Sequence, residues 1–347
     1  MDQAGIVAVS SIALPNPFQN DCEALKASIF ARIRPDLDRI EREIQLQLDS
    51  NIALISLVGR YILGSGGKRL RPLLMILGAR LCGYQGQDDA RLSVVFEFLH
   101  SSSLLHDDVV DHAEFRRSQP AANTIWGNPG VVLVGDFLYS KSILMTVHYG
   151  SIPILKVLSE ATTKMAEGEV LQLVHSDDLE LDEADYLDVI TRKTAVLISA
   201  ACEVGAIFGK GTESRQQAMR DYGHNLGIAF QLVDDTLDYT GDAKELGKPV
   251  GNDIQEGKAT LPLIHAMRNG PPSAKARLRQ IFSDEHIPPE SFDEVRELVI
   301  QAGGIEYTQR RAMEHVQQAK TALSVFPPHP TRELLRDIAD YVIFRRT

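Results

Sequence analysis

The sequence has few cysteines and no excess of positive charge. Only three of its 347 residues are cysteines, Cys22, Cys82 and Cys202, and none forms a Cys-x-x-Cys pair. A disulfide framework is therefore not indicated, and we expect reduced thiols in a cytoplasmic protein. The formal net charge is -11, whereas a nucleic-acid-binding domain usually carries a basic face. We expect no nucleic acid partner, and an anionic ligand would need a local basic cluster or metal ions.

Long hydrophobic runs are also scarce. We find no stretch of about 20 consecutive apolar residues, the length that crosses a bilayer, so no transmembrane segment is predicted. The opening MDQAGIVAVSSIALP contains an apolar run but no basic residue before it. This pattern argues against a secretory signal.

Strand signals are sparse, and helical periodicity dominates. Apolar residues recur every three or four positions over 23–48, 91–111, 186–209 and 218–240. GVVLVG could form a short strand, but the residues after it continue at helical spacing. Gly- and Pro-rich breakers cluster at 64–72, 118–130, 247–258 and 268–273, without a long flexible linker. We expect an N-terminal arm (1–20) and a single all-α domain (21–347).

Two acidic motifs share one spacing. Both read D-D-x-x-D, and they comprise Asp107, Asp108 and Asp111 in the first and Asp234, Asp235 and Asp238 in the second. On a helix, positions i and i+4 lie about 40° apart around the axis, so the outer aspartates of each motif share a face. Each such pair can hold a hard divalent cation, and Mg2+ also keeps water ligands and bridges to phosphates.

A solvated acidic helix face is the plainer interpretation of one such motif. Apolar residues flank both copies, namely Leu104, Leu105, Val109 and Val110 in the first and Leu232, Val233 and Leu237 in the second. Repetition and apolar surroundings together favour inward-facing carboxylates that share a metal site within a helical bundle.

Basic residues gather near glycines and near both motifs. They are Lys68, Arg69 and Arg71 in GGKRLRP, Arg116 and Arg117 after the first motif, Lys193 in TRKTA, and Lys248 and Lys258 after the second motif. Any one of them alone is more often a solvated surface charge. Grouped with two metal motifs, they indicate a diphosphate site. GSGGKR lacks the spacing of a P-loop, so ATP chemistry is not indicated.

With these motifs in this order, the sequence resembles the trans-isoprenyl (polyprenyl) diphosphate synthases of the long-chain type. The likeness runs from about residue 25 to the end and rests on GGKRLRP, LLHDDVVD with RR, GDFL, TRKTA, FQLVDDTLD and GKPVGNDIQEGKATLP. It implies a homodimer of large helical bundles, each around a deep central cavity (the isoprenoid synthase fold). It also implies a transferase that adds isopentenyl diphosphate repeatedly to an allylic diphosphate (geranyl, farnesyl or geranylgeranyl).

The resemblance also implies a role for each motif residue. Asp107, Asp111 and Asp234 would ligate a cluster of three Mg2+ ions on the allylic diphosphate, supported by Asp108, Asp235 and Asp238. That diphosphate would also contact Arg116, Lys193 and Lys258, with Lys248 a weaker candidate. Isopentenyl diphosphate would contact Lys68, Arg71, His100 and Arg117. Lys193, Thr194 and Gln231 would be catalytic, with Thr194 and Gln231 facing the developing allylic cation.

Helical spacing supports two of these roles. His100 lies seven residues before Asp107, and Gln231 lies four before Asp235, so each pair falls on nearly one face. A lone histidine in an apolar helix is otherwise more often a core residue.

The implied chemistry needs no Ser-His-Asp or Cys-His nucleophile. Metal ions and basic side chains stabilise the leaving pyrophosphate, so an allylic carbocation forms. The isopentenyl double bond attacks this cation, and a proton then passes to the released pyrophosphate. A dry apolar cavity protects the cation from water.

Product length depends on the residues before the first motif. Short-chain synthases resemble this sequence except for bulky aromatics at Ser102 and Ser103, which close the tunnel. Two serines leave it open and predict a product of about C40 to C50 for a ubiquinone-type side chain, with Leu99 and Phe96 deeper in the wall. Alternatively, the serines only pack or bond within the helix, and a product of about C15 to C20 stays open. A lipid-like product implies transient membrane contact at release.

Three other interpretations stay open. A class I terpene cyclase would usually replace the second acidic motif and would not need Lys68, Arg71 and His100. A non-catalytic partner subunit typically loses aspartates from one motif, whereas all six are present here. A helical scaffold with acidic faces would not be stabilised by Mg2+ and a diphosphate ligand.

Overall fold

Helices account for nearly all regular structure in the residues that the computed structural model describes, 19–117, 119–176, 178–241, 251–255, 257–282 and 291–344. In chain order they are α1 (Gln19–Gln47), α2 (Ala53–Gly64), α3 (Leu70–Leu81), α4 (Asp89–Val110), α5 (Ala122–Val147), α6 (Ile152–Val174), α7 (Glu183–Ile190), the π-helical turn η1 (Thr191–Ala195), α8 (Val196–Phe208), α9 (Glu213–Thr240), α11 (Asn252–Gln255), α12 (Leu261–Asn269), α13 (Pro272–Phe282), α14 (Ser291–Gln301), α15 (Gly304–Ala322), the 3-10 turn η2 (Leu323–Val325) and α16 (Pro330–Phe344). Strands β1 (Phe115–Arg116) and β2 (Gln119–Pro120) form a small antiparallel hairpin. The predicted all-α fold is confirmed.

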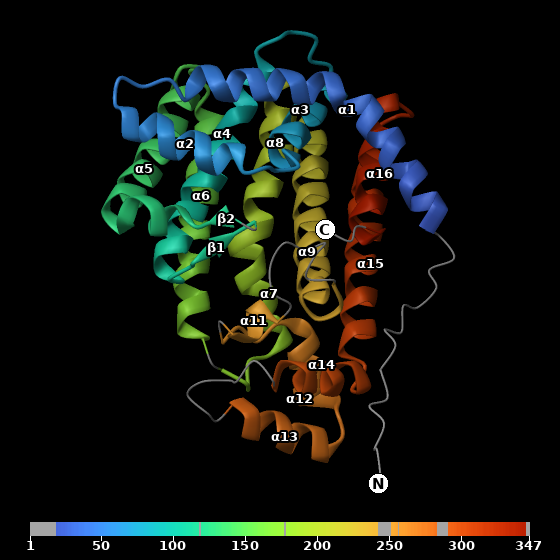
Figure 1. Ribbon diagram of the computed structural model, residues 1–347. Coiled ribbons are helices and arrows are strands. Elements are labelled where there is room, and N and C mark those ends of the chain that lie inside the picture. Colours follow the sequence, from blue (N-terminus) through green and yellow to red (C-terminus); the bar gives the residue numbers. More distant parts are fainter. Residues whose placement is uncertain are drawn as a thin grey trace.

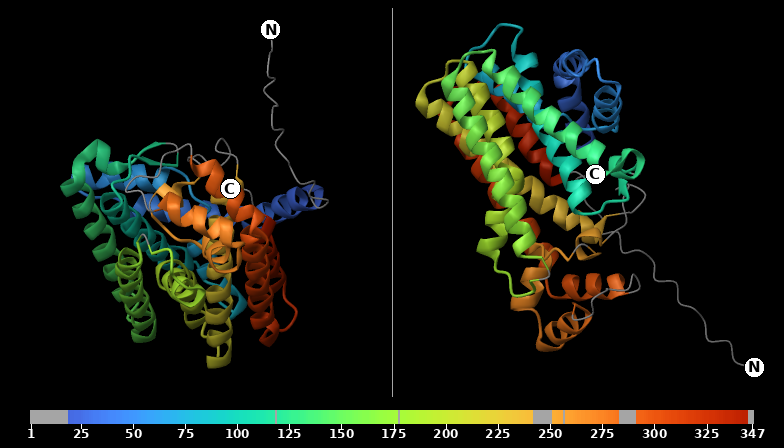
Figure 2. Two further views of the ribbon diagram at one scale, coloured as in Figure 1. Left: turned by 90° about the horizontal axis from the view of Figure 1, so that it is seen from below. Right: turned by 90° about the vertical axis from the view of Figure 1, so that its left-hand side faces the viewer.

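Long helices lie side by side and form the body of the molecule (Figure 1). α4 packs along α5, α9 packs between α8 and α15, and α3 packs against α8. Figure 2 shows the long helices inclined in a common direction in its right-hand view. α1 crosses one end of the bundle, at the top of Figure 1, and α12, α13 and α14 gather at the other end.

One apolar core joins the helices from Ile29 on α1 to Val342 on α16. α3 is almost fully enclosed in this core, and Leu73 to Leu77 are each at most 2% exposed. A helix that is apolar all round is expected to be buried on every side. A smaller apolar cluster, which includes Leu278 and Val295, packs the C-terminal helices against Tyr239 at the end of α9.

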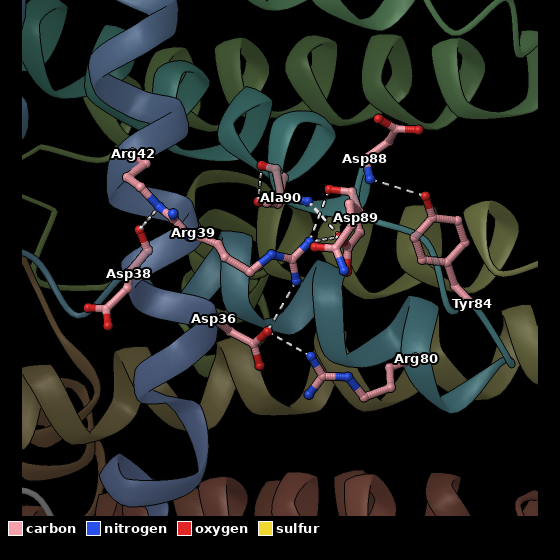
Figure 3. Close-up of polar contacts among 11 residues, drawn as sticks. Asp36, Asp38, Arg39, Arg42, Arg80, Tyr84, Asp88, Asp89 and Ala90 are labelled. Atoms are coloured by element: carbon pink, nitrogen blue, oxygen red, sulfur yellow. Dashed lines mark hydrogen bonds and ion pairs between the residues drawn. The ribbon is translucent and has the colours of Figure 1, made fainter.

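Buried charges fasten α1 to α3 and α4 (Figure 3). Asp36 accepts hydrogen bonds from Arg80 at 2.7 Å and from Arg39 at 3.4 Å, and Arg39 also pairs with Asp89. Asp36 and Asp89 are each only 4% exposed. Because a buried carboxylate is costly without a partner, this pairing fixes where α1 crosses the bundle.

α5 differs from the sequence-based expectation. Breakers were expected over 118–130 and a possible strand in GVVLVG, but helix begins at Ala122 and contains all of GVVLVG. Its only interruption is a kink at Gly127, where φ is 75°, followed by Pro129. Kinks of this kind occur where glycine or proline breaks the hydrogen-bond ladder.

Among the described residues, α5 is also the one helix long and apolar enough to cross a membrane, by length and composition alone. The helix is not an unbroken apolar run of about 20 residues, so this finding does not contradict the expectation that the sequence has no such run. Asp136 and Lys141 interrupt the run without making the helix polar on average. Since α5 packs along α4, and core helices pass the same test, the finding is weak evidence for a membrane span.

Candidate active site

The first acidic motif lies at the carboxyl end of α4. The Asp111 amide donates to the Asp107 carbonyl at 2.8 Å, so helical register continues through the motif and places both residues on one face. Burial is the main cause that raises the pKa of Asp107 to about 7, opposed by Lys193 and reinforced by Glu169. A nearby cation would favour the ionised form of this carboxyl group.

Asp108 faces the hairpin that follows the motif. The Nε of Arg116 donates to Oδ1 of Asp108 at 2.5 Å, and the carboxylate is fully buried. Oδ2 of Asp108 is also buried and has no hydrogen-bond partner among the described residues. A buried carboxylate oxygen that lacks a donor is suited to a metal ion or an ordered water.

The second acidic motif lies in the last turns of α9. Asp235 is 3% exposed and Asp238 is 1% exposed. Oδ2 of Asp238 accepts the Asp253 amide at 3.0 Å, which ties α11 to α9. Burial raises the pKa of Asp235 to about 7, and hydrogen bonds from Tyr186 and Gln231 oppose this rise.

Basic side chains lie between the two motifs. Nζ of Lys258 is 3.5 Å from Oδ2 of Asp111, and the Lys258 amide bonds the Asp253 carbonyl beside the second motif. Burial lowers the pKa of Arg71 from α3, and the nearby carboxylates of Glu97 and Asp234 oppose that effect. Side chains from α3, α4 and α9 therefore converge on one region.

The segment TRKTA forms η1, a π-helical turn that the sequence analysis missed. Nζ of Lys193 pairs with Oε2 of Glu169 on α6 at 2.6 Å. The neighbouring Thr194 donates its hydroxyl to Oε1 of Gln231 on α9 at 2.9 Å. A π-turn changes the direction of successive side chains and is frequent at functional sites. Here it connects adjacent residues to two different helices.

Two glycines allow η1 to approach these helices closely. A Cβ on Gly168 of α6 would lie 2.7 Å from the backbone nitrogen of Lys193. A Cβ on Gly227 of α9 would lie 2.6 Å from the Cα of Ala195. Any larger residue would have to move the backbone of η1. The glycines therefore set the position of the Lys193 and Thr194 side chains.

Candidate residues for isopentenyl diphosphate lie around the start of α3 and the middle of α4. Lys68 is exposed just before α3 and Arg117 is exposed in the hairpin turn, while Arg71 and His100 are half-buried. The pKa of His100 is lowered well below its usual value, first by burial and then by the positive charges of Arg71 and Arg117. His100 is therefore a neutral hydrogen-bonding group in a basic environment.

Arg69, between two of these candidates, acts as an anchor instead. Its guanidinium donates to Glu97 of α4 at 2.7 Å, to Glu41 of α1 at 2.6 Å and to the Leu63 carbonyl at 2.5 Å. Arg69 and Glu97 are both 7% exposed, and Arg69 has a left-handed backbone with φ of 48°. Sequence reasoning missed Glu97, although its place three residues before His100 was the available signal.

The proposed chain-length residues occupy the interior of α4. Leu99 is 2% exposed and Phe96 is fully buried. The Ser102 hydroxyl donates to the Gly135 carbonyl of α5 at 2.8 Å, and the Ser103 hydroxyl donates to the His100 carbonyl at 2.9 Å. Ser102 thus packs against α5, and Ser103 bonds within its own helix. These are the two roles that compete with an open tunnel. Ser103 is the less buried of the two.

Some sequence-based assignments lie outside the described residues. They are Lys248 and the arm up to residue 18.

Comparison with known proteins identifies the family. The family described as Polyprenyl synthetase matches residues 52–299. Octaprenyl diphosphate synthase of Haemophilus influenzae is 42% identical over 305 residues, which cover 88% of this chain and 92% of that protein.

Solved structures agree. Polyprenyl synthase from Caulobacter crescentus CB15, complexed with calcium and isoprenyl diphosphate, superposes with a TM-score of 0.88 at 40% identity, covering 92% of this chain and 97% of its own. A decaprenyl diphosphate synthase from Rhodobacter capsulatus has a TM-score of 0.86 at 39% identity, covering 92% and 99%. The chain therefore belongs to the polyprenyl synthetase family and is a prenyltransferase.

Proposed function

We propose that this enzyme condenses isopentenyl diphosphate repeatedly onto an allylic diphosphate and releases a long-chain all-trans polyprenyl diphosphate. The observation that carries the proposal is the convergence of two D-D-x-x-D motifs, from α4 and α9, with the basic residues Lys193, Lys258 and Arg71. The likeness to octaprenyl and decaprenyl diphosphate synthases supports a long product.

The residues fit a magnesium cluster. Carboxylate oxygens of Asp107, Asp111 and Asp234 are hard ligands of the kind that Mg2+ prefers, and the unpartnered Oδ2 of Asp108 is a further buried acceptor. We propose three Mg2+ ions with substrate bound, with Asp235 and Asp238 in support. Bound Mg2+ would supply charge neutralisation for the departing pyrophosphate.

The basic residues then divide between the two diphosphates. Arg116, Lys193 and Lys258 hold the allylic diphosphate, and Lys193 exchanges its Glu169 partner for a phosphate oxygen. Lys68, Arg71, Arg117 and neutral His100 hold isopentenyl diphosphate. Thr194 and Gln231 direct oxygen atoms at the allylic carbon as positive charge develops. The proton lost after condensation passes to the released pyrophosphate.

The growing chain runs along α4 away from the aspartates. From Asp107 back to Asp89 the helix extends about 27 Å at 1.5 Å per residue. At that far end lies a cavity of about 560 Å³, whose lining includes Tyr84, Tyr149 and Phe208. A path of this length along the apolar interior residues of α4 would suit an extended polyprenyl tail that serves as a quinone side chain.

We further propose a cytoplasmic homodimer. Apolar side chains are exposed along α5 and α6, namely Leu133, Leu144 and Val147 on α5 and Ile152, Val170, Leu173 and Val174 on α6. Exposed apolar side chains along two helices that pack together are typical of a protein interface, and a second copy would cover them. Sedimentation equilibrium at micromolar concentration should give twice the chain mass, and a monomer would exclude this part of the proposal.

The activity is tested by incubating the protein with farnesyl diphosphate, labelled isopentenyl diphosphate and Mg2+, with and without chelator. We expect a Mg2+-dependent ladder of products that ends at about C40 to C50. Termination at about C15 to C20 would retain the chemistry and reject the long tail. No incorporation by a folded protein would favour a non-catalytic partner subunit.

A further inference from the structure

A continuous chain of hydrogen bonds connects α7 to the reacting centre. The Tyr186 hydroxyl donates to Oδ2 of Asp235. Nε2 of Gln231 donates to Oδ1 of the same carboxylate at 2.8 Å, and Oε1 of Gln231 accepts the Thr194 hydroxyl at 2.9 Å. Tyr186 and Asp235 are each 3% exposed, so two of the four members lie outside bulk water.

The donor and acceptor roles of these groups determine the direction of each hydrogen bond in the series. Nε2 of Gln231 faces Asp235 in the structure, as an ionised carboxylate requires because it only accepts hydrogen bonds. The amide oxygen is then forced to the opposite side, toward Thr194. Reversing the amide would place its oxygen against Asp235 and leave two acceptors facing each other in a buried setting, which is unfavourable.

We propose that Tyr186 is a positioning residue that, through Asp235, holds the Gln231 amide with its oxygen toward the allylic cation. Each oxygen of Asp235 accepts one hydrogen bond, from Tyr186 or from Gln231, and we assign Asp235 to this hydrogen-bond chain and not to direct metal ligation. The inference rests on the proposed function, since it assigns how the cation-facing amide of that site is oriented. Oxygen atoms fixed before reaction stabilise developing positive charge without reorganisation.

The enclosed position of Tyr186 suits this role. Burial, then the charge of Asp235, raises the pKa of Tyr186 well above its usual value, so the phenol stays a donor. Its ring also packs in the main apolar core. Tyr186→Phe therefore removes one hydroxyl while keeping the ring.

The matched control is Tyr222→Phe. Tyr222 lies on α9, is fully buried and donates one hydrogen bond, to the Leu335 carbonyl at 2.7 Å. Both substitutions remove one buried hydrogen bond and should lower the melting temperature by similar amounts. Only Tyr186→Phe should lower kcat, by roughly tenfold or more, with the KM for isopentenyl diphosphate and the half-saturating Mg2+ concentration unchanged.

A second variant, Asp235→Asn, keeps the number of hydrogen bonds but reverses the direction of the bond between residue 235 and Gln231. The new carboxamide can accept from Tyr186 and donate to Oε1 of Gln231, whose nitrogen then faces Thr194. We expect a folded protein with kcat lowered at least as far as in Tyr186→Phe and an unchanged Mg2+ requirement. A direct metal ligand would instead show a raised Mg2+ requirement, which would overturn the assignment of Asp235.

The wild-type enzyme, assayed in parallel, separates failure of the inference from failure of the proposed function. Wild-type turnover together with a kcat for Tyr186→Phe equal to that of Tyr222→Phe overturns the inference alone. Absence of wild-type turnover on any allylic diphosphate overturns the proposed function and the inference together. If Tyr186→Phe does not fold, Asp235→Asn decides, because a normal kcat in that variant would contradict the predicted reversal of the Gln231 amide.

Discussion

At the scale of single residues, Glu97 determines how the basic segment before α3 is held. Its carboxylate pairs with Arg69 in a setting where both are 7% exposed, next to Arg71 and Arg117. We predict that Glu97→Gln raises the KM for isopentenyl diphosphate by roughly tenfold, about 1.4 kcal/mol, with little change in kcat. Steady-state kinetics with saturating allylic substrate measure this.

The control for that variant is Asp36→Asn. Asp36 is also a buried carboxylate that pairs with arginine. It bonds Arg39 and Arg80 where α1 packs on α3, away from the basic segment before α3 (Figure 3). Loss of one partner from a buried pair costs about 3 kcal/mol or more, so both variants should be less stable. An equal rise in KM for both would mean that Glu97 contributes only to stability.

A substitution at Ser103 tests at the same scale whether the product tail passes along α4. We predict that Ser103→Phe shortens the main product to about C20 or less, because an aromatic side chain fills the path next to Asp107. Ser103→Ala removes the bond to the His100 carbonyl without adding volume and should leave product length unchanged. Product chromatography compares the two, and equal shortening would reject the steric explanation.

At the scale of elements, η1 depends on the close approach of α9. Gly227→Ala would place a methyl group 2.6 Å from the Ala195 Cα, so η1 must shift and carry Thr194 with it. We predict a loss of about 2 kcal/mol in the free energy of unfolding and at least a tenfold lower kcat, measured by urea unfolding and kinetics.

Gly64→Ala is the matched control for that change. Gly64 ends α2, and a methyl group added there would have no neighbouring atom within 4 Å. Alanine should therefore stabilise the helix by up to about 1 kcal/mol. Normal activity in Gly227→Ala would show that η1 tolerates displacement.

The contact between α9 and α15 should give the protein a pH dependence. Burial is the main cause that lowers the pKa of His315 to about 4, and its ring bonds Asn225 at 2.9 Å. An unfolded histidine titrates near 6.5, so between about pH 6.5 and pH 4 the unfolded chain binds more protons and stability falls as pH falls.

We therefore predict that the melting temperature drops less between pH 7 and pH 5 in His315→Gln than in the wild type. Other titrating groups are common to both proteins, so the difference isolates His315. Parallel curves for the two proteins would show that its pKa is not lowered by folding.

At the scale of the whole molecule, local periodicity predicted much of the fold and the shared helix face within the first acidic motif. Helical spacing placed Asp107 with Asp111, because that relation depends only on neighbours along the chain. Helical spacing did not predict the hydrogen bond from Tyr186 to Asp235, which lies 49 residues further along the sequence. It also did not predict the π-turn at Lys193. Both depend on tertiary packing. The kink at Gly127 was also missed, because the sequence permits either a loop or a broken helix there.

The central claim is that both acidic motifs, from helices distant in sequence, hold one metal-diphosphate unit. Thermal unfolding with Mg2+ and inorganic pyrophosphate tests it most directly. We predict that the melting temperature of the wild type rises by several degrees with both ligands present. Asp107→Ala and Asp234→Ala should each abolish most of that rise. A full rise in either variant would contradict a shared site.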